Sequence, residues 1–162
     1  MYGTALVRAP SDRLAEGIVT HIARSSVDVA VAREQHAAYA AALAAVGWAI
    51  GPVPSAEDCP DSVFVEDTVV VCEDLAVLAR PGAAARRAEV GGTARVVASL
   101  GFRTAQIEDP GTLDGGMCCR PGPRCTSGAA VGPTPKASAN CARCLPRWAA
   151  RWSPCRSGTC CI

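Results

Sequence analysis

The sequence predicts an α/β protein over its first two-thirds, followed by a tail in which no regular structure can be recognised. Two observations carry this prediction. Apolar segments typical of strands alternate with longer segments of helical periodicity, and the alternation stops after Gly116. At 162 residues the chain could bury one core of ordinary size, so nothing about its length demands two domains.

The first elements are expected in the order strand, helix, strand. Residues 2–8 are apolar and are followed by a proline that discourages a helix. A helix is predicted from Asp28, which can cap it, to Gly47, which can end it in a left-handed conformation. Residues 48–53 then form a second strand. The proposed helix face carries Ala32, His36, Tyr39, Leu43 and Val46 at alternating four- and three-residue spacings.

The next elements continue the pattern. Residues 63–72, rich in β-branched side chains, and residues 75–79 predict a hairpin that turns at Glu73-Asp74. A second helix is expected over residues 84–100, with Gly101 as its stop, and a last strand over residues 102–107. The order strand, helix, strand, strand, strand, helix, strand predicts strands inside and helices outside.

The tail after Gly116 has a different composition. Residues 117–162 hold no Asp or Glu but seven Lys or Arg, a charge of +7, whereas nine Arg against fifteen acids give residues 1–116 a charge of −6. Eight of the ten cysteines lie in this tail. Prolines interrupt every window in which a helix or strand could run, at Pro121, Pro123, Pro133, Pro135, Pro146 and Pro154.

Composition excludes several classes of function. With 49% hydrophobic and 19% charged residues and a net charge of +1, the whole chain shows no bias toward nucleic acid or membranes. The start lacks the apolar stretch of a signal peptide, and no apolar run could span a bilayer. We therefore expect a cytoplasmic protein in which Cys59 and Cys72 are buried or half-buried apolar side chains.

Three carboxylates, those of Asp61, Glu66 and Asp67, stand in and beside an otherwise apolar predicted strand. Burying an unpaired carboxylate is costly, so Glu66 and Asp67 are expected either where the strand meets water or facing a cation. A guanidinium presents a fork of donors that matches paired carboxylates, which makes an arginine-like ligand a candidate. The alternative is a solvated hairpin end whose acids pair with Arg80, Arg86 or Arg87.

Several separated motifs point to one family, and they occur in its order and at its spacing. They are Leu6-Val7-Arg8-Ala9, Val27-Asp28-Val29 with Gln35-His36 and Tyr39, Pro60-Asp61-Ser62-Val63-Phe64-Val65-Glu66-Asp67, Arg80-Pro81-Gly82-Ala83 with Arg86-Arg87 and Glu89, and Thr112-Leu113-Asp114-Gly115-Gly116. Through them, residues 5–116 resemble the amino-terminal part of dimethylarginine dimethylaminohydrolases, members of the pentein superfamily.

The resemblance implies a five-bladed, propeller-like α/β fold, of which this chain would hold the first blades. It implies hydrolysis of methylated arginines to citrulline and a methylamine, with a cysteine nucleophile and a histidine as general acid and base. By position, Asp61, Glu66 and Asp67 would hold the substrate guanidinium, Arg86 would bind the substrate carboxylate, and Val19 would contact substrate from an amino-terminal loop. No cofactor or metal is implied, the expected partner is the small-molecule substrate, and the oligomeric state stays open.

The match to the catalytic machinery is incomplete. Asp114 corresponds to the acid that supports the catalytic histidine, and Gly115-Gly116 follow in register, but the family continues Gly-Gly-Asp-Val where this chain has Met117-Cys118. The family's histidine, cysteine and second carboxylate-binding arginine lie beyond this point, where nothing matches. His21 and His36 precede the motifs, and His36 is expected on a helix face. We therefore expect an inactive chain; a non-catalytic guanidine-binding or interaction protein is the alternative.

A shifted reading frame accounts for the tail. Codons for Asp-Val-Leu of the form GAT GTG CTG, followed by C, give Met117-Cys118-Cys119 when read from their second base. The same shift converts residues 133–138 to Thr-Asn-Ala-Glu-Gly-Ile and residues 139–148 to an amphipathic helical segment. The rival account is a zinc site around Cys141-Ala142-Arg143-Cys144, which lacks a well-spaced second pair. Residues 1–116 are thus expected to form an incomplete pentein domain, and residues 117–162 a non-homologous, irregular or disordered tail.

Sequencing the gene through the codons of Gly115 and Gly116 tests this account. We expect that restoring one base there recovers Asp-Val-Leu and extends the family match downstream, because a lost base changes every later codon at once. A locus in which no single-base restoration extends the match past Gly116 would contradict the shifted frame.

Overall fold

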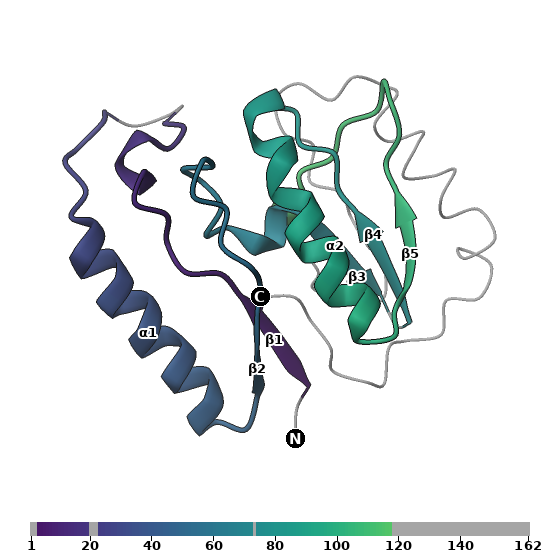
Figure 1. The fold of residues 1–162 in the computed structure, drawn as a ribbon, viewed down its shortest axis with the longest axis horizontal. Helices are drawn as coiled ribbons and strands as arrows, with labels where there is room; N and C mark the ends of the chain where they lie inside the picture. The colour runs from purple at the N-terminus through teal and green to yellow at the C-terminus, as the bar shows by residue number, and fades with distance from the viewer. Residues whose placement is uncertain (1–2, 20–22, 73, 118–162) are drawn as a thin grey trace.

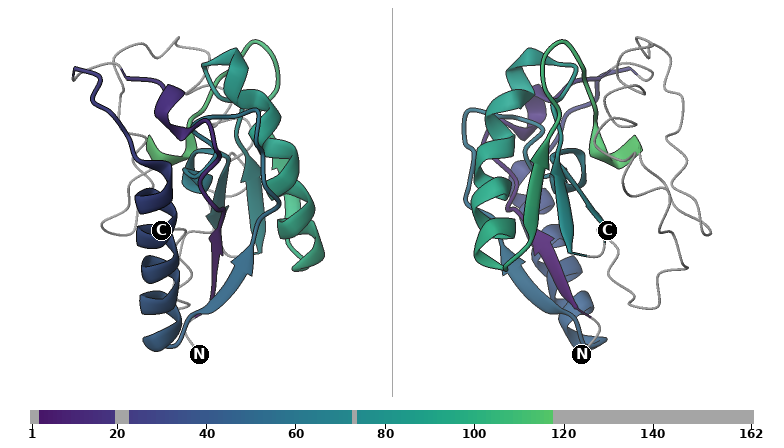
Figure 2. Two further views of the ribbon diagram at one scale, coloured as in Figure 1. Left: turned by 60° about the vertical axis from the view of Figure 1, so that its left-hand side comes forward. Right: turned by 90° about the vertical axis from the view of Figure 1, so that its right-hand side faces the viewer.

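Two small sheets, each with one long helix beside it, make up the part of the chain that the computed structural model describes, residues 3–19, 23–72 and 74–117 (Figure 1). The elements of the first unit are β1 (Thr4–Val7), α1 (Val29–Ala45) and β2 (Ala49–Pro52). Those of the second are β3 (Val69–Cys72), β4 (Leu75–Leu78), α2 (Val90–Ser99) and β5 (Arg103–Gln106). In the left view of Figure 2 the strands lie between α1 and α2, as the sequence predicts for an α/β protein.

Strands β1 and β2 pair in parallel, with Thr4 opposite Ala49, and α1 is the crossover between them. The helix starts and stops where the sequence predicts. The Asp28 side chain accepts hydrogen bonds from the backbone N–H of Ala30 at 2.9 Å and of Val31 at 3.2 Å. Gly47 follows the helix with φ of 97°. Parallel pairing thus places the carboxyl ends of both strands at one edge, followed by the loops that lead to the site.

The predicted apolar face of α1 is only partly covered. Ala32, His36 and Leu43 are half-buried, whereas Tyr39 and Val46 are exposed and no residue of the helix is fully buried. His36 lies on the helix face as expected, and partial burial lowers its pKa.

The strand predicted from residue 63 begins only at Val69. Residues 61–68 instead form turns and a short 3-10 helix, η2 (Val65–Asp67). The backbone N–H of Asp67 donates to the Phe64 carbonyl at 3.1 Å, and that of Thr68 donates to the Val65 carbonyl at 3.0 Å. The expectation that the carboxylates of Asp61, Glu66 and Asp67 lie in or beside a strand is therefore wrong, because local hydrogen bonds and tertiary contacts override the β-propensity of this segment.

The rest of the hairpin follows the prediction. Strands β3 and β4 pair antiparallel, with Cys72 opposite Leu75, and β5 joins β4 in parallel. The helix predicted over residues 84–100 is two elements, the 3-10 helix η3 (Ala84–Glu89) and then α2. At their junction the Glu89 carbonyl accepts a hydrogen bond from the Arg8 side chain at 2.9 Å. Gly101, with φ of 86°, ends α2 as predicted.

The core lies on both faces of the central strand β4, all of whose residues are buried. On one face, Val97 of α2 packs with Val69, Ala76 and Leu78. On the other face, Leu75 and Val77 pack with Ile107, and Leu113 adds to the cluster. A strand buried on both faces carries a continuous apolar run, which is the pattern of residues 75–79.

The described residues form two separate sheets and no closed barrel or propeller, so the partial propeller stays a prediction. The tail, residues 117–162, lies outside them apart from Met117, which closes a short 3-10 helix, η4 (Gly115–Met117). Within the described ranges, no helix combines the length and the apolar character needed to cross a bilayer.

Arg8 joins the two units through a side chain that is only 1% exposed. From the end of β1 its guanidinium donates to the carbonyls of Pro54 at 2.9 Å, Ser62 at 3.0 Å and Glu89 at 2.9 Å, and to the Thr93 hydroxyl at 3.2 Å. Burial lowers the pKa of Arg8, and the nearby Glu89 opposes this change. The side chain therefore satisfies buried acceptors from three segments that are distant in sequence.

Replacing Arg8 with Met should lower the free energy of unfolding by about 3–5 kcal/mol, because the buried acceptors lose their charged donor. Urea denaturation checks this. The matched control is Arg33→Met, whose side chain is 45% exposed and pairs with Asp12, and which should cost less than about 1 kcal/mol. Equal effects of the two substitutions would contradict the assignment.

Candidate functional site

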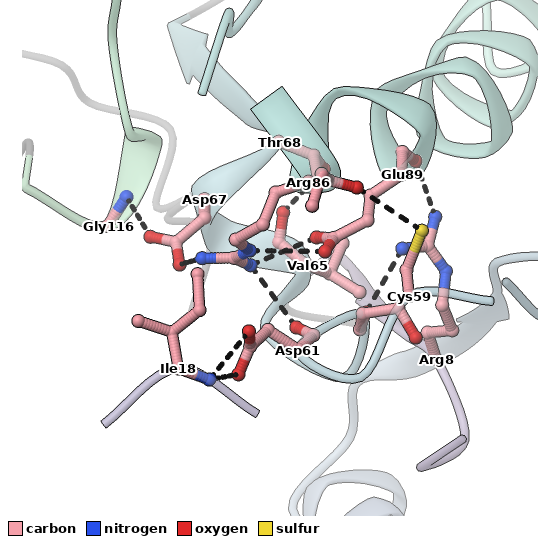
Figure 3. A network of polar contacts seen from close by, with 12 residues as sticks. Arg8, Ile18, Cys59, Asp61, Val65, Asp67, Thr68, Arg86, Glu89 and Gly116 are labelled. Atoms are coloured by element: carbon pink, nitrogen blue, oxygen red, sulfur yellow. Dashed lines mark hydrogen bonds and ion pairs between the residues drawn. The ribbon is translucent and has the colours of Figure 1, made fainter. Parts of the chain in front are cut away.

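The acidic residues singled out in the sequence gather where three short 3-10 helices meet. Glu66 and Asp67 lie on η2, Arg86 lies on η3, and Asp114 immediately precedes η4, which packs against η2. Figure 3 shows Asp67 and Arg86 facing each other. Short 3-10 turns place consecutive side chains close together without a regular ladder, so they can direct neighbouring carboxylates toward one cation.

Arg86 is the cation at the centre of this group. Its Nη1 lies 2.6 Å from Asp67 Oδ2, while Nε and Nη2 form a bidentate pair with Glu89 at 3.1 and 2.9 Å. Nη2 also donates to the Asp61 carbonyl at 3.2 Å. Burial alone would lower the pKa of Arg86, but its hydrogen bonds to Glu89 and Asp67 outweigh that effect and raise it.

These contacts decide one question that the sequence leaves open. Asp67 pairs with Arg86, which is one of the three arginines that the sequence offers as partners. The pair does not lie at a solvated hairpin end, because the Arg86 and Asp67 side chains are only 13% and 20% exposed. Arg80 pairs instead with Asp109, and Arg87 donates to the Pro81 carbonyl at 3.1 Å. Arg86 is therefore the cation around which the acids gather.

Glu66 and Asp114 are half-buried near Asp67. Burial raises the pKa of Glu66, and the negative charge of Asp67 raises it further. Burial likewise raises the pKa of Asp114, with the Gly82 backbone N–H acting in the opposite sense and Asp67 again adding to the rise. Both acids also sense Arg86. The three carboxylates are thus within electrostatic range of one another and of a single guanidinium.

Gly115 and Gly116 can pack directly against Glu66 and Asp67 because glycine has no side chain. A Cβ on Gly115 would lie 2.2 Å from the Glu66 carbonyl oxygen, and one on Gly116 would lie 2.5 Å from Asp67 Oδ1. The backbone N–H of Gly116 donates to that same Asp67 oxygen at 3.1 Å. The carboxylate of Asp67 therefore bridges η3 and η4, a role that the Gly-Gly motif alone did not reveal.

Asp61 is placed differently from the other acids. Its carboxylate, 8% exposed, accepts the Ile18 N–H, with distances of 3.2 and 3.0 Å to its two oxygens (Figure 3). The next residue, Val19, is 39% exposed at the end of a described stretch. The structure therefore brings Glu66, Asp67, Arg86 and Asp114 together, and it directs the Asp61 side chain to the loop that carries Val19.

The sequence placed Arg8 and Glu89 in family motifs without indicating their contacts, and it did not single out Ile18. Glu89 stands three residues after Arg86, a helical spacing that could have signalled the ion pair. The partners of Arg8 and Ile18 lie more than 40 residues away, and no local pattern reports them.

Among the described residues, no group of three or more His, Cys, Asp or Glu side chains is arranged to hold a metal ion. Cys59 is buried and Cys72 is half-buried, as predicted. The zinc-binding alternative falls on cysteines of the tail, outside the described residues.

Curated proteins with similar sequences decide the family of this segment. Dimethylarginine dimethylaminohydrolase of Streptomyces coelicolor is 56% identical over 112 residues, which are 69% of this chain and 43% of that protein. The enzyme of the same name from Pseudomonas aeruginosa is 36% identical over 118 residues, 72% of this chain and 46% of its own length. The amino-terminal segment of this chain is a dimethylarginine dimethylaminohydrolase homologue. The chain spans about half the length of these curated relatives, and no family model matches it.

Solved structures agree with this dimethylarginine dimethylaminohydrolase assignment. A variant of the enzyme as an adduct with S-methyl-L-thiocitrulline superposes with a TM-score of 0.81 at 31% identity, covering 91% of this chain and 58% of that one. The Pseudomonas aeruginosa enzyme, as a mutant complexed with citrulline, gives a TM-score of 0.67 at 36% identity, over 72% of this chain and 46% of that one. AgrE with L-arginine, 19% identical with a TM-score of 0.59, shares the fold over 71% of this chain and 17% of that one.

Proposed function

We propose that residues 1–116 are the guanidine-binding half of a dimethylarginine dimethylaminohydrolase, whose reaction converts methylated arginines to citrulline and a methylamine. One observation carries the proposal. Glu66 and Asp114 are half-buried beside Asp67, and their pKa values are raised first by burial and then further by the negative charge of Asp67. Arg86 divides its single positive charge between Asp67 and Glu89. The cluster therefore carries excess negative charge, which a bound guanidinium would neutralise.

The ligand class follows from this charge and from the relatives. A guanidinium offers several donors in one plane, which suits a group of carboxylates better than a compact ammonium does. Related enzymes are described with citrulline and with S-methyl-L-thiocitrulline. Both compounds share the length and the amino-acid end of arginine, which supports an arginine derivative as the ligand here.

Arg86 keeps one donor for the other end of such a ligand. A guanidinium has five N–H groups, and the described hydrogen bonds use four of them. The second hydrogen on Nη1 is the one left over, so Arg86 can bind a substrate carboxylate, as the resemblance implies, without releasing Asp67 or Glu89. Glu66 and Asp67 would then hold the guanidinium, and Asp114 would support an acid/base group.

Turnover needs an activated nucleophile and a proton donor, and neither Cys59 nor His36 among the described residues is suited to these roles. Burial raises the pKa of Cys59, which disfavours the reactive thiolate. His36 stands on α1, whereas the acidic cluster is built from η2, η3 and η4. We therefore propose that this chain binds guanidines without hydrolysing them, since ground-state binding alone does not lower the barrier. A non-catalytic guanidine-binding or interaction protein is the second candidate, and it rests on the same carboxylates.

Calorimetry with asymmetric dimethylarginine and with arginine should give saturable heat. Glu66→Ala should weaken binding by about 10-fold or more, because a charged hydrogen-bond acceptor contributes about 1.5–3 kcal/mol. Glu34→Gln, on the exposed surface of α1, is the matched control and should bind normally. The absence of heat in the unaltered chain would sink the proposal. Citrulline release that disappears in Asp114→Asn would instead refute the inactivity of the chain.

Affinity for a guanidinium should rise with pH. Burial and the charge of Asp67 raise the pKa values of Glu66 and Asp114, so both acids take up a proton at a higher pH than ordinary carboxyls do. A protonated acid no longer attracts the cation, and binding should strengthen as pH climbs through the raised pKa values. Dissociation constants across a pH series measure this. Glu66→Gln should flatten the profile, and an affinity independent of pH would contradict the role of these acids.

A further inference from the structure

Two charged side chains bind the backbone of the loop before α1, and one of them connects this loop to the acidic cluster. The first is Asp61. Its carboxylate accepts the Ile18 N–H, with 3.0 Å to Oδ2 and 3.2 Å to Oδ1. This approach is possible because residue 17 is a glycine, since a Cβ there would lie 2.5 Å from Asp61 Oδ1 and 3.2 Å from the Leu14 carbonyl oxygen.

The second side chain is Arg24. Its guanidinium donates to the carbonyls of Ala15 at 2.5 Å and Gly17 at 2.7 Å. The positively charged Arg24 therefore binds carbonyls of the loop, while the negatively charged Asp61 binds the Ile18 N–H. Both contacts are charge-assisted, and together they fix the position of the Ile18 backbone.

Asp61 also connects this loop to the ion pairs. Its side chain binds Ile18, while its own carbonyl accepts from Arg86 Nη2 at 3.2 Å (Figure 3). One residue thus contacts the loop on one side and the central cation of the cluster on the other. With its carboxylate buried and turned toward Ile18, Asp61 is poorly placed to grip a ligand guanidinium beside Glu66 and Asp67.

We propose that Asp61 is a positioning residue, which together with Arg24 and Gly17 clamps the loop of Gly17, Ile18 and Val19 beside the acidic cluster. This inference rests on the proposed function for its consequence, which is that ligand affinity depends on the clamp. The clamp fixes the backbone that carries two exposed apolar side chains, Ile18 at 54% and Val19 at 39%, and Figure 3 shows Ile18 beside Asp61. These side chains supply apolar surface for the methylene chain or methyl groups of a bound methylarginine.

Two variants of the full chain disturb the clamp without touching Glu66, Asp67 or Arg86. Gly17→Ala adds one methyl group at the point of closest approach, and Arg24→Gln removes the cation from the loop carbonyls. Their matched controls are Gly91→Ala, where a Cβ would lie 3.9 Å from Arg95 Nη1, and Arg33→Gln, an arginine that donates to the Pro10 carbonyl elsewhere.

The first measurement is hydrogen exchange at the Ile18 amide, made without ligand. We expect slow exchange in the unaltered chain and exchange about 10-fold faster or more in Gly17→Ala and Arg24→Gln, with both controls unchanged. The Ile107 amide, bonded to the Leu78 carbonyl at 3.0 Å, reports whether each variant remains folded. If Gly17→Ala unfolds, Arg24→Gln decides. Fast exchange of Ile18 in the unaltered chain, or unchanged protection in a folded clamp variant, would overturn the clamp.

The second measurement is the affinity for asymmetric dimethylarginine. Both clamp variants should bind at least several-fold more weakly, although no carboxylate of the cluster has changed. A variant whose Ile18 amide exchanges freely but whose affinity is unaltered would overturn the link between loop and ligand. If the unaltered chain binds no methylarginine, the proposed function fails, and exchange at Ile18 by itself then decides whether Asp61 and Arg24 hold the loop.

Discussion

The buried guanidinium of Arg8 is the contact on which the arrangement of the described residues depends. It extends from the first sheet and donates to backbone carbonyls before η2 and at the start of α2. A buried charge is tolerated only where its donors are satisfied, and here each donation ties a different segment to β1. Gly92 leaves space for it, since a Cβ there would lie 3.0 Å from Arg8 Nη2. Together with the ion pair between Arg86 and Asp67, this side chain fixes the position of η2 relative to η3.

A second arginine uses the same chemistry nearer the surface. Arg8 binds backbone carbonyls, whereas Arg86 binds the side-chain carboxylates of Asp67 and Glu89. The contacts of Arg86 therefore bring negatively charged groups close together. Glu89 links the two arginines, because its carbonyl binds Arg8 and its carboxylate binds Arg86. Glu89 thus connects the buried guanidinium of Arg8 to the acidic cluster, which helps to hold several acids close together in a small structure.

The sequence predicted what is decided locally. Asp28 as a cap and Gly47 and Gly101 as stops depend only on neighbouring backbone groups, and all three were identified correctly. The segment from Val63 to Thr68 was assigned wrongly to a strand, because its turns are fixed by local hydrogen bonds and by partners of Asp67 such as Arg86 and Gly116, 19 and 49 residues away. For the same reason the gathering of Glu66, Asp67 and Asp114 could be expected only from family resemblance. The turn of the Asp61 carboxylate toward Ile18 could not be expected at all.

The close packing of Gly115 and Gly116 against Glu66 and Asp67 lies at an informative point in the gene. These two residues pack against the acidic cluster without side chains, and the resemblance predicts Asp where the next residue, Met117, stands. Under the proposed function, the carboxylates that recognise a guanidine are encoded upstream of this point, and the resemblance places the nucleophile, the acid/base histidine and a second carboxylate-binding arginine downstream of it. Under the proposed function, a single lesion at this point would separate guanidine binding from turnover.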